Sequence, residues 1–310
     1  MSRLLKIGTL AFPAWVLAAS LIALREPGVF TWFRGPLIPL GLGLIMLGMG
    51  LTLEVADFRR VLRRPAPIGL GVVLQFLVMP LLGWSLAWAF GLPTGFAVGL
   101  ILVSCCPGGV ASNVISYLSL ADVPASVSMT AVSTAVSVLM TPALTTLLAG
   151  SRVEVPAAGL LFDTFWVVIL PIVTGLVLQR RFPRVTKAVL PAGPFVSVVL
   201  ITLIVASIIG ASREVILESG GSLLGAVFAL HIGGFGLGYG LSRLLRRPEK
   251  TARTVAIEVG MQNSGLGVVL ARQNFASPLV AVPSAMSSLT HSLIGSLLAG
   301  VWRLRPGEDR

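Results

Sequence analysis

The sequence predicts an all-α polytopic membrane protein with ten transmembrane helices in two inverted repeats of five helices. Hydrophobic residues make up 55% of the 310 residues and charged residues only 11%, against about 25% in soluble domains. So few charges could not cover a soluble surface, and a mean hydropathy of +0.94 excludes a disordered chain, which needs low hydrophobicity. Long unbroken apolar runs exclude a transmembrane β-barrel, whose residues alternate in segments of about ten.

Ten apolar runs follow one another, each near the roughly 20 residues that a helix needs to cross a bilayer. They fall at about 8–24, 36–55, 66–90, 94–118, 123–149, 157–179, 188–211, 220–242, 251–272 and 277–301. The first run follows two basic residues, but Pro13 and its length favour a retained helix over a signal peptide. The connections are short and polar, so we expect no soluble domain.

The basic residues support ten helices with both termini in the cytoplasm. If the N-terminus lies inside, 18 of the 23 Lys and Arg residues fall in inside segments, as the positive-inside rule requires. The five outside residues are Arg25, Arg34, Arg152, Arg213 and Arg272. Nine or eleven helices would remove this bias. The net charge of +11 therefore reflects cationic loops on one side of a membrane, and we expect no nucleic-acid partner.

The two halves of the chain repeat each other. Shifting the first five runs by about 153 residues places them on the last five. Because each half holds an odd number of helices, the second half is inverted in the membrane, an arrangement typical of secondary transporters. We therefore expect one repeat in residues 1–150, with helices 1–5, and the other in residues 151–310, with helices 6–10.

The fourth and ninth runs are interrupted at matching places. The fourth contains Pro107, Gly108 and Gly109, which remove a backbone donor and weaken a helix. The ninth contains three glycines within 258–267, beside glutamate, glutamine and asparagine. Paired interruptions point to a substrate site near the bilayer midplane. Packing kinks that let helices approach closely are the alternative, but a kink needs no such polar residues.

Glu258 is the one acid deep in an apolar run, where a charge costs about 2.5–3.5 kcal/mol. No Lys or Arg lies at a comparable depth, so its partner is a mobile cation or a proton. Many oxygen donors favour Na⁺ over a proton, and a divalent ion would more often bind several carboxylates. These donors are Gln75, Ser112, Asn113, Ser126, Thr130, Gln262 and Asn263. Any lone hydroxyl could instead bond to the carbonyl four residues before it.

The two cysteines and two histidines invite another interpretation. Cys105 and Cys106 are adjacent, a poor basis for a disulfide, and a Cys–His nucleophile with His231 or His291 would lack an orienting acid nearby in sequence. We therefore expect no enzyme and no cofactor, and cysteines that pack at the helix break. His231 lies beside a Gly-rich stretch, and we expect it to pack between helices. His291 lies in a polar stripe, 287–292, that we expect to face a cavity.

The two interrupted segments together resemble the bile acid:sodium symporter family, and the resemblance covers essentially the whole chain. The segments read Cys105-Cys106-Pro107-Gly108-Gly109 with Ala111-Ser112-Asn113-Val114, and Glu258-Val259-Gly260-Met261-Gln262-Asn263-Ser264-Gly265-Leu266-Gly267. The resemblance implies a core domain, in which helices 4 and 9 cross at their breaks, and a panel domain that moves against it.

The resemblance also implies two sodium sites and a substrate site. Sodium site 1 would use Ser112, Asn113, Ser126, Thr130 and Glu258. Sodium site 2 would use Gln75, Glu258 and Gln262, with backbone carbonyls near Val259 and Met261. The substrate would meet backbone N–H groups near Gly109, Val110, Ser264 and Gly265, and the side chains of Asn263 and His291. Many relatives carry Thr at the position of Val110, which removes a hydroxyl here.

The function expected from this resemblance is sodium-coupled symport of an organic anion by alternating access, with about two Na⁺ per anion. The anion would be bile-acid-like or a small carboxylate such as pantoate or a 2-oxo acid, the class linked to bacterial and plastid relatives. The alternatives are a proton-coupled carrier, or a metalloid efflux protein of related architecture that uses Glu258 and the cysteines. We expect Na⁺, a small organic anion and the lipid bilayer as partners, and no obligate protein partner.

Overall fold

The computed structural model describes residues 11–63 and 65–304. The basic residues predicted at both cytoplasmic termini therefore lie partly outside the described residues, namely Arg3, Lys6, Arg305 and Arg310, and so does Arg64. The predicted position of the termini is untested for this reason.

Helices make up most of the described chain. The α-helices are α2 (Phe12–Arg25), α3 (Leu37–Thr52), α4 (Val55–Arg63), α5 (Pro65–Ala89), α6 (Thr94–Ser104), α7 (Ser112–Leu118), α8 (Val123–Ala149), α9 (Ala157–Thr164), α10 (Leu170–Arg181), α11 (Pro183–Val189), α12 (Gly193–Ala211), α13 (Arg213–Leu244), α14 (Glu249–Gly260), α15 (Ser264–Asn274) and α16 (Val282–Leu304). Short turns are η1 (Pro27–Val29), η3 (Leu190–Ala192) and η4 (Pro278–Ala281), and the π-helical turn η2 (Phe165–Ile169) continues α9 into α10.

Five helical stretches of the described chain are long and apolar enough to cross a membrane. They are Pro65–Ala89, Val123–Ala149, Ala157–Arg181, Pro183–Ala211 and Gly221–Leu244. Three shorter apolar helices, Phe12–Arg25, Leu37–Thr52 and Thr94–Ser104, fall below the usual spanning length. The structure is thus a polytopic helical membrane protein, and the count of ten crossings remains a prediction, because the fourth and ninth runs are each divided into two short helices.

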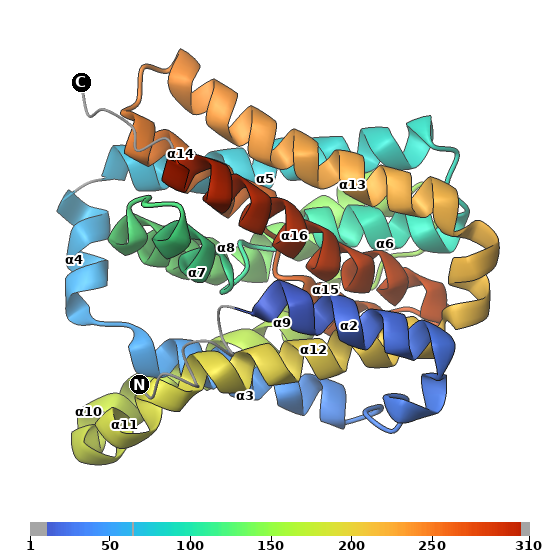
Figure 1. Cartoon of the computed structure of the whole chain (residues 1–310), viewed down its shortest axis with the longest axis horizontal. Coiled ribbons are helices and arrows are strands. Elements are labelled where there is room, and N and C mark those ends of the chain that lie inside the picture. The colour runs from blue at the N-terminus through green and yellow to red at the C-terminus, as the bar shows by residue number, and fades with distance from the viewer. Residues whose placement is uncertain (1–10, 64, 305–310) are drawn as a thin grey trace.

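The helices form two layers (Figure 1). One layer contains α2, α3, α10 and α12, which pack mainly against one another. The other contains α5, α6, α8 and α13–α16, which share most of their contacts. The layers meet where α12 and α2 contact α16, and where α15 contacts α3.

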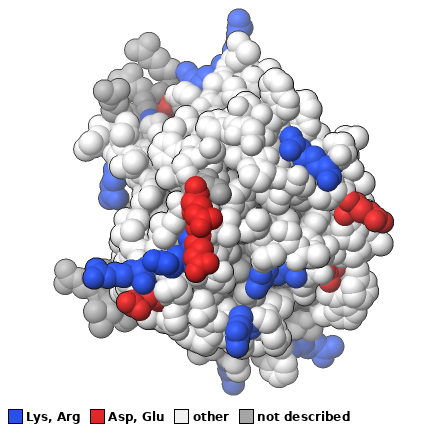
Figure 2. Space-filling view, turned by 90° about the vertical axis from the view of Figure 1, so that its right-hand side faces the viewer, with Lys and Arg blue, Asp and Glu red and all other residues white. Residues whose placement is uncertain are grey.

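The connections predicted to lie inside are grouped at one end of the bundle, on the left of Figure 1, with α4, α11 and the turn between α13 and α14. Figure 2 shows the opposite end, where Lys, Arg, Asp and Glu are scattered among uncharged atoms. In α4, which the apolar runs do not predict, Arg60 Nη1 lies 2.9 Å from Asp57 Oδ1. The two residues lie three apart, so this ion pair joins neighbouring turns of α4.

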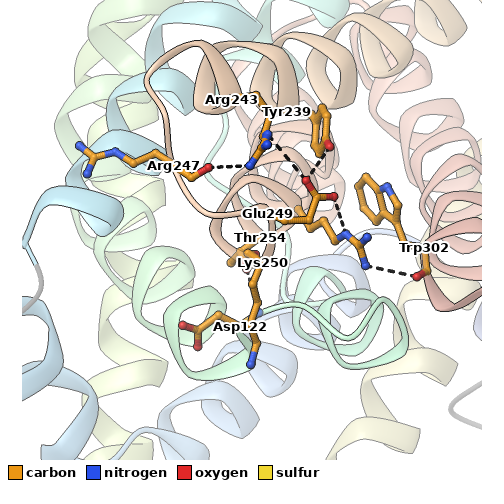
Figure 3. Close-up of polar contacts among 9 residues, drawn as sticks. Asp122, Tyr239, Arg243, Arg247, Glu249, Lys250, Thr254 and Trp302 are labelled. Carbon is orange, nitrogen blue, oxygen red and sulfur yellow. Dashed lines mark hydrogen bonds and ion pairs between the residues drawn. The ribbon is translucent and has the colours of Figure 1, made fainter. Parts of the chain in front are cut away.

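A polar cluster anchors the start of α14 at the end of the bundle that holds the connections predicted to lie inside (Figure 3). Glu249 accepts hydrogen bonds from Tyr239 Oη at 2.8 Å and from Arg253 Nε at 2.9 Å. Arg243 Nε of α13 lies 3.7 Å from the same carboxylate. Arg253 Nη1 also donates to the backbone carbonyl of Trp302 in α16 at 3.2 Å. These contacts join α13, α14 and α16, so they fix how deep the rest of α14 lies.

Helices α3 and α10 pack closely at one glycine on each helix, Gly50 and Gly175. An ideal Cβ built on Gly50 would lie 2.2 Å from the backbone oxygen of Ile172, and one on Gly175 would lie 2.5 Å from that of Leu47. No side chain fits at such a distance, so these backbones can approach only because both residues lack a Cβ. By contrast, Gly48 on the same helix has nothing within 4 Å of the position of its Cβ.

We therefore predict that Gly50→Ala lowers the free energy of unfolding by about 1–3 kcal/mol through overpacking. Gly48→Ala should leave the free energy unchanged or raise it by up to about 1 kcal/mol, because alanine favours helix over glycine. Thermal unfolding of both variants in the same detergent measures the difference. Equal melting temperatures for the two variants would show that α3 and α10 do not pack this closely.

Candidate sodium and substrate sites

The two interrupted segments meet at one crossing. Gly108 and Gln262 form an antiparallel β-bridge, in which Gly109 N–H donates to the Met261 carbonyl at 2.9 Å and Asn263 N–H donates to the Pro107 carbonyl at 2.8 Å. Backbone groups left free by one break are thereby satisfied by the other, which is the condition for non-helical backbone at membrane depth. The breaks are therefore one paired structure, and they are not independent packing kinks.

A ladder of contacts aligns α8 with α14 beside this crossing. Asp122 Oδ1 accepts from Ala125 N–H at 3.1 Å and so caps the N-terminus of α8. The Asp122 backbone N–H donates to Thr254 Oγ1 at 2.9 Å, and Figure 3 shows these two residues near the Glu249 cluster. One turn further along each helix, Ser126 faces Glu258. The cap of α8 thus sets the register at which its hydroxyls reach the carboxylate.

All five residues predicted for sodium site 1 lie together. Glu258 Oε1 accepts from Ser112 Oγ at 2.6 Å and from Ser126 Oγ, and Glu258 Oε2 accepts from Thr130 Oγ1 at 2.8 Å. Asn113 Oδ1 lies 3.0 Å from Ser126 Oγ. The three hydroxyls are fully buried and Glu258 is 3% exposed. One carboxylate among hydroxyl and amide oxygens is a hard-oxygen set that suits Na⁺.

Among the described residues, no ion pair includes Glu258. Arg253 is nearly as buried, at 5% exposure, but it lies more than a turn away on α14 and bonds to Glu249 and Trp302. The hydrogen-bond partners of the Glu258 carboxylate in the described chain are hydroxyl groups.

The residues predicted for sodium site 2 lie on the other side of the carboxylate. Gln75 Nε2 donates to the Cys106 carbonyl at 2.8 Å and to Gln262 Oε1 at 2.9 Å. Gln75 Oε1 is buried and has no donor among the described residues, and Gln75 and Glu258 line one small pocket. A buried acceptor without a donor costs about 1–3 kcal/mol, and a cation would remove that cost.

The predicted backbone ligands of this site are already engaged on one side. The Val259 carbonyl accepts from Gln262 Nε2 at 3.1 Å, and the Met261 carbonyl accepts from Gly109 N–H at 2.9 Å. Because each carbonyl oxygen has two lone pairs, both retain capacity for an ion. The protein groups therefore fit a second cation between Gln75 and Glu258.

All six residues predicted for the substrate line one pocket at the crossing. They are Gly109, Val110, Asn263, Ser264, Gly265 and His291. Next to it lies a cavity of about 260 Å³ that extends between the two layers toward the end of the bundle with α4 and α11, where it reaches Thr52, Leu118 and Val189. Val110 and Ala111 line both. Of the residues lining the larger cavity, only Thr52, Asn113 and Ser197 carry polar side chains, and none is charged.

Of the four backbone N–H groups expected to hold the substrate, two are already hydrogen-bonded and two are free in the described chain. Gly109 N–H is used in the bridge, and Ser264 N–H donates to the Gln262 carbonyl at 2.8 Å. In the described chain, the N–H groups of Val110 and Gly265 have no acceptor. The Asn263 side chain behaves similarly: Oδ1 accepts from Leu266 N–H at 3.1 Å, while Nδ2 is buried without an acceptor. The free donors at the start of α15 suit an anion.

Comparisons with known proteins show the family to which this chain belongs. The sodium bile acid symporter family profile matches residues 39–219. This protein belongs to that family. The probable chloroplastic sodium/metabolite cotransporter BASS2 of Oryza sativa subsp. japonica is 46% identical over 99% of this chain and 74% of its own length. The uncharacterized sodium-dependent transporter YocS of Bacillus subtilis is 41% identical over 94% of this chain and 90% of its own length.

This membership of the family identifies a sodium-dependent transporter, and the prediction that the protein is no enzyme is confirmed by relatives that are named cotransporters. The probable cotransporter BASS1 of Arabidopsis thaliana is also 45% identical over 94% of this chain and 73% of its own length. Cys105 and Cys106 are buried free thiols at the break, as expected for packing residues.

Sequence reasoning missed the contacts of two buried polar residues, Ser116 and His231. Ser116 Oγ lies 3.1 Å from Ser126 Oγ, behind sodium site 1. His231, which we expected only to pack, lies 2.8 Å from the Gly260 carbonyl and 2.7 Å from Ser287 Oγ. The spacing of Ser287 and His291, one helical turn apart, was a signal for a shared face. No local pattern could link either of them to His231, which is 56 residues from Ser287.

We predict that Glu258→Gln abolishes the stabilisation of this transporter by sodium. Sodium at about 100 times its Kd should stabilise the parent by about 2.7 kcal/mol, because it binds only the folded state. Thermal unfolding in NaCl and in KCl at equal ionic strength measures this difference. Glu249→Gln on the same helix is the control: it should lower stability equally in both salts and keep the sodium effect. A sodium response retained in Glu258→Gln would exclude Glu258 as a ligand.

Proposed function

We propose that this protein is a symporter that couples two Na⁺ to the inward transport of one small organic carboxylate by alternating access. One observation carries the proposal: buried atoms without partners have opposite character on the two sides of the crossing. Gln75 Oε1, on the side of Glu258, is an acceptor that suits a cation. Asn263 Nδ2, on the side of α15, is a donor that suits an anion.

Sodium would bind before the anion. At site 1 the hydroxyls of Ser112, Ser126 and Thr130 now donate to Glu258, and rotation of each hydroxyl would turn a lone pair toward the ion. Two Na⁺ beside one carboxylate leave a net positive charge next to the β-bridge. The bridge joins both breaks, so the ions would stabilise the N-terminus of α15 in the geometry that receives a carboxylate.

Movement would then follow the layers. The chain consists, in this proposal, of inverted repeats in residues 1–150 and 151–310, which together build a panel of α2, α3, α10 and α12 and a core that holds the crossing. The cavity between panel and core reaches the end that carries most basic loops. With that end in the cytoplasm and the protein in a bacterial plasma membrane, this is an inward-facing form.

The cavity favours a small acid over a sterol conjugate. Its volume of about 260 Å³ is below the roughly 300–1,000 Å³ typical of drug-sized ligands. Its apolar walls suit a carboxylate with a short branched carbon chain, such as pantoate or a 2-oxo acid. Val110 stands at the mouth of the substrate pocket, so the N–H groups and Asn263 would supply the polar contacts there. The hydroxyl and amide oxygens around Glu258 favour Na⁺ as the coupling ion. Among the described residues, no group of three or more His, Cys, Asp and Glu lies together as a metal site would require.

We predict electrogenic uptake of radiolabelled pantoate or pyruvate into proteoliposomes. An inward sodium gradient should drive accumulation, and an equal potassium gradient should not. With two Na⁺ per monovalent anion, one positive charge enters per cycle, worth about 2.3 kcal/mol per 100 mV. An inside-negative potassium diffusion potential should therefore raise uptake several-fold. Uptake that follows a proton gradient, or ignores the potential, would contradict the proposed coupling.

We also predict that Asn263→Asp weakens anion binding at least tenfold and preserves stabilisation by sodium. Aspartate keeps an oxygen that caps α15 through Leu266 N–H, but it replaces the free Nδ2 donor by a negatively charged acceptor. Titration of pantoate or pyruvate in saturating NaCl measures the loss. Asn263→Ser, which keeps a capping oxygen without the charge, is the control and should bind with intermediate affinity. Unchanged anion affinity in both variants would remove Asn263 from the site.

A further inference from the structure

A continuous chain of buried hydrogen bonds runs behind the crossing, through α13, α16 and α15. His231 Nδ1 lies 2.8 Å from the Gly260 carbonyl, and His231 Nε2 lies 2.7 Å from Ser287 Oγ. Ser264 Oγ lies 3.0 Å from Ser287 Oγ and 3.2 Å from His291 Nε2. The four side chains are at most 3% exposed, and the two imidazole rings lie edge to face with centroids 5.2 Å apart.

One carbonyl fixes the direction of the whole chain. The Gly260 oxygen can only accept, so Nδ1 of His231 carries the proton and Nε2 of the neutral ring accepts from Ser287. The Ser287 proton is then committed, so Ser287 accepts from Ser264. The Ser264 proton is committed in turn, so Ser264 accepts from Nε2–H of His291. We call these four side chains, together with the Gly260 carbonyl, the histidine relay.

The two ends of the histidine relay lie at the two proposed binding sites. Gly260 is the last residue of α14, between Val259 and Met261, whose carbonyls are the backbone ligands proposed for sodium site 2. Ser264 is the first residue of α15, and Ser264 and His291 line the substrate pocket. His231 lines neither of the two pockets at the crossing. It therefore reaches the sodium side through Gly260. On the substrate side it is joined by hydrogen bonds through Ser287 and Ser264, and its ring also contacts the ring of His291.

We propose that His231 is a positioning residue that couples sodium occupancy to anion affinity through the histidine relay. The inference rests on the proposed sodium–anion symport. Binding of Na⁺ to the carbonyls on either side of Gly260 moves the acceptor to which His231 donates, and the relay transmits this displacement to Ser264. Because the relay turns the Ser264 proton toward Ser287, Ser264 offers the substrate no proton. The free donors of Gly265 and Asn263 are left to bind the carboxylate.

The first test measures the coupling itself. The sodium Kd is determined for the purified full-length protein without anion and with saturating pantoate or pyruvate, and the ratio of the two values is the coupling factor, typically 5–150-fold. Ser287→Ala interrupts the relay without touching either ion site. His231→Asn keeps a donor near Nδ1 and removes the acceptor at Nε2. Both should lower the coupling factor at least fivefold and change the sodium Kd without anion less than twofold.

The matched control is Ser137→Ala in α8. Ser137 is fully buried like Ser287, but its hydroxyl donates only to the Thr134 carbonyl of its own helix at 2.7 Å. Ser137→Ala removes a buried hydroxyl oxygen, as Ser287→Ala does, but the coupling factor of Ser137→Ala should equal that of the parent. A residue that merely packs would behave like this control, so unchanged coupling in both Ser287→Ala and His231→Asn would overturn the proposal.

A second readout needs neither sodium nor anion. The chain has only two histidines, so ¹⁵N-histidine NMR resolves both rings, and His231→Asn assigns them. The relay requires the Nδ1–H tautomer at His231 and the Nε2–H tautomer at His291. Ser287→Ala should shift the ¹⁵N signals of both rings, and Ser137→Ala neither. The opposite tautomers, or a His291 signal that does not respond to Ser287→Ala, would overturn the relay.

The two readouts separate this inference from the proposed function. If sodium and the anion fail to stabilise the parent, the symport proposal fails with the parent alone, and the coupling role of His231 falls with it. The tautomers still decide whether the directed relay exists. If the parent couples sodium to the anion but Ser287→Ala couples them equally well, the symport proposal stands and the relay is wrong.

Discussion

The structure depends on the pairing of two backbone interruptions inside an apolar protein. Each break leaves N–H and C=O groups that the membrane cannot satisfy, and the antiparallel bridge between Gly108 and Gln262 satisfies them mutually. An ideal Cβ on Gly109 would lie 2.6 Å from the Gln262 oxygen, so the approach requires glycine there. Every polar group of the candidate sites is placed relative to this bridge.

The crossing alone would not hold the carboxylate in register. Glu258 receives its hydroxyl partners from α7 and α8, and the Asp122 cap fixes α8 against Thr254 one turn earlier. The Glu249 cluster anchors the other end of the same helix to α13 and α16. The position of the buried Glu258 therefore depends on a helix cap at Asp122 and on the ion pairs of Glu249, all of which lie outside the sodium sites.

The crossing has oxygen atoms that suit a cation on one side and N–H groups that suit an anion on the other, only a few residues apart. Oxygen donors face Glu258 on one side, and N–H groups with Asn263 Nδ2 face the substrate pocket on the other. The bridge is shared, so the backbone on the two sides of the crossing is directly hydrogen-bonded. Family membership and the relatives' names agree with a sodium-dependent transporter, and the cavity between the layers shares Val110 and Ala111 with the pocket at the crossing.

The sequence by itself determined the membrane class, the apolar runs and the two breaks, because hydropathy and Pro–Gly interruption are local signals. It also singled out Glu258 as an acid deep in an apolar run, whereas the two sets of proposed sodium ligands came from the resemblance to a known family. It could not determine α4 as a separate helix, nor which amides at the breaks remain free. Gly109 and Ser264 lose their N–H groups to partners that only the folded crossing supplies. The contacts of His231 with Gly260 and Ser287 join residues far apart in the chain. Tertiary structure decided them, since hydrogen-bond direction depends on which acceptor lies within reach.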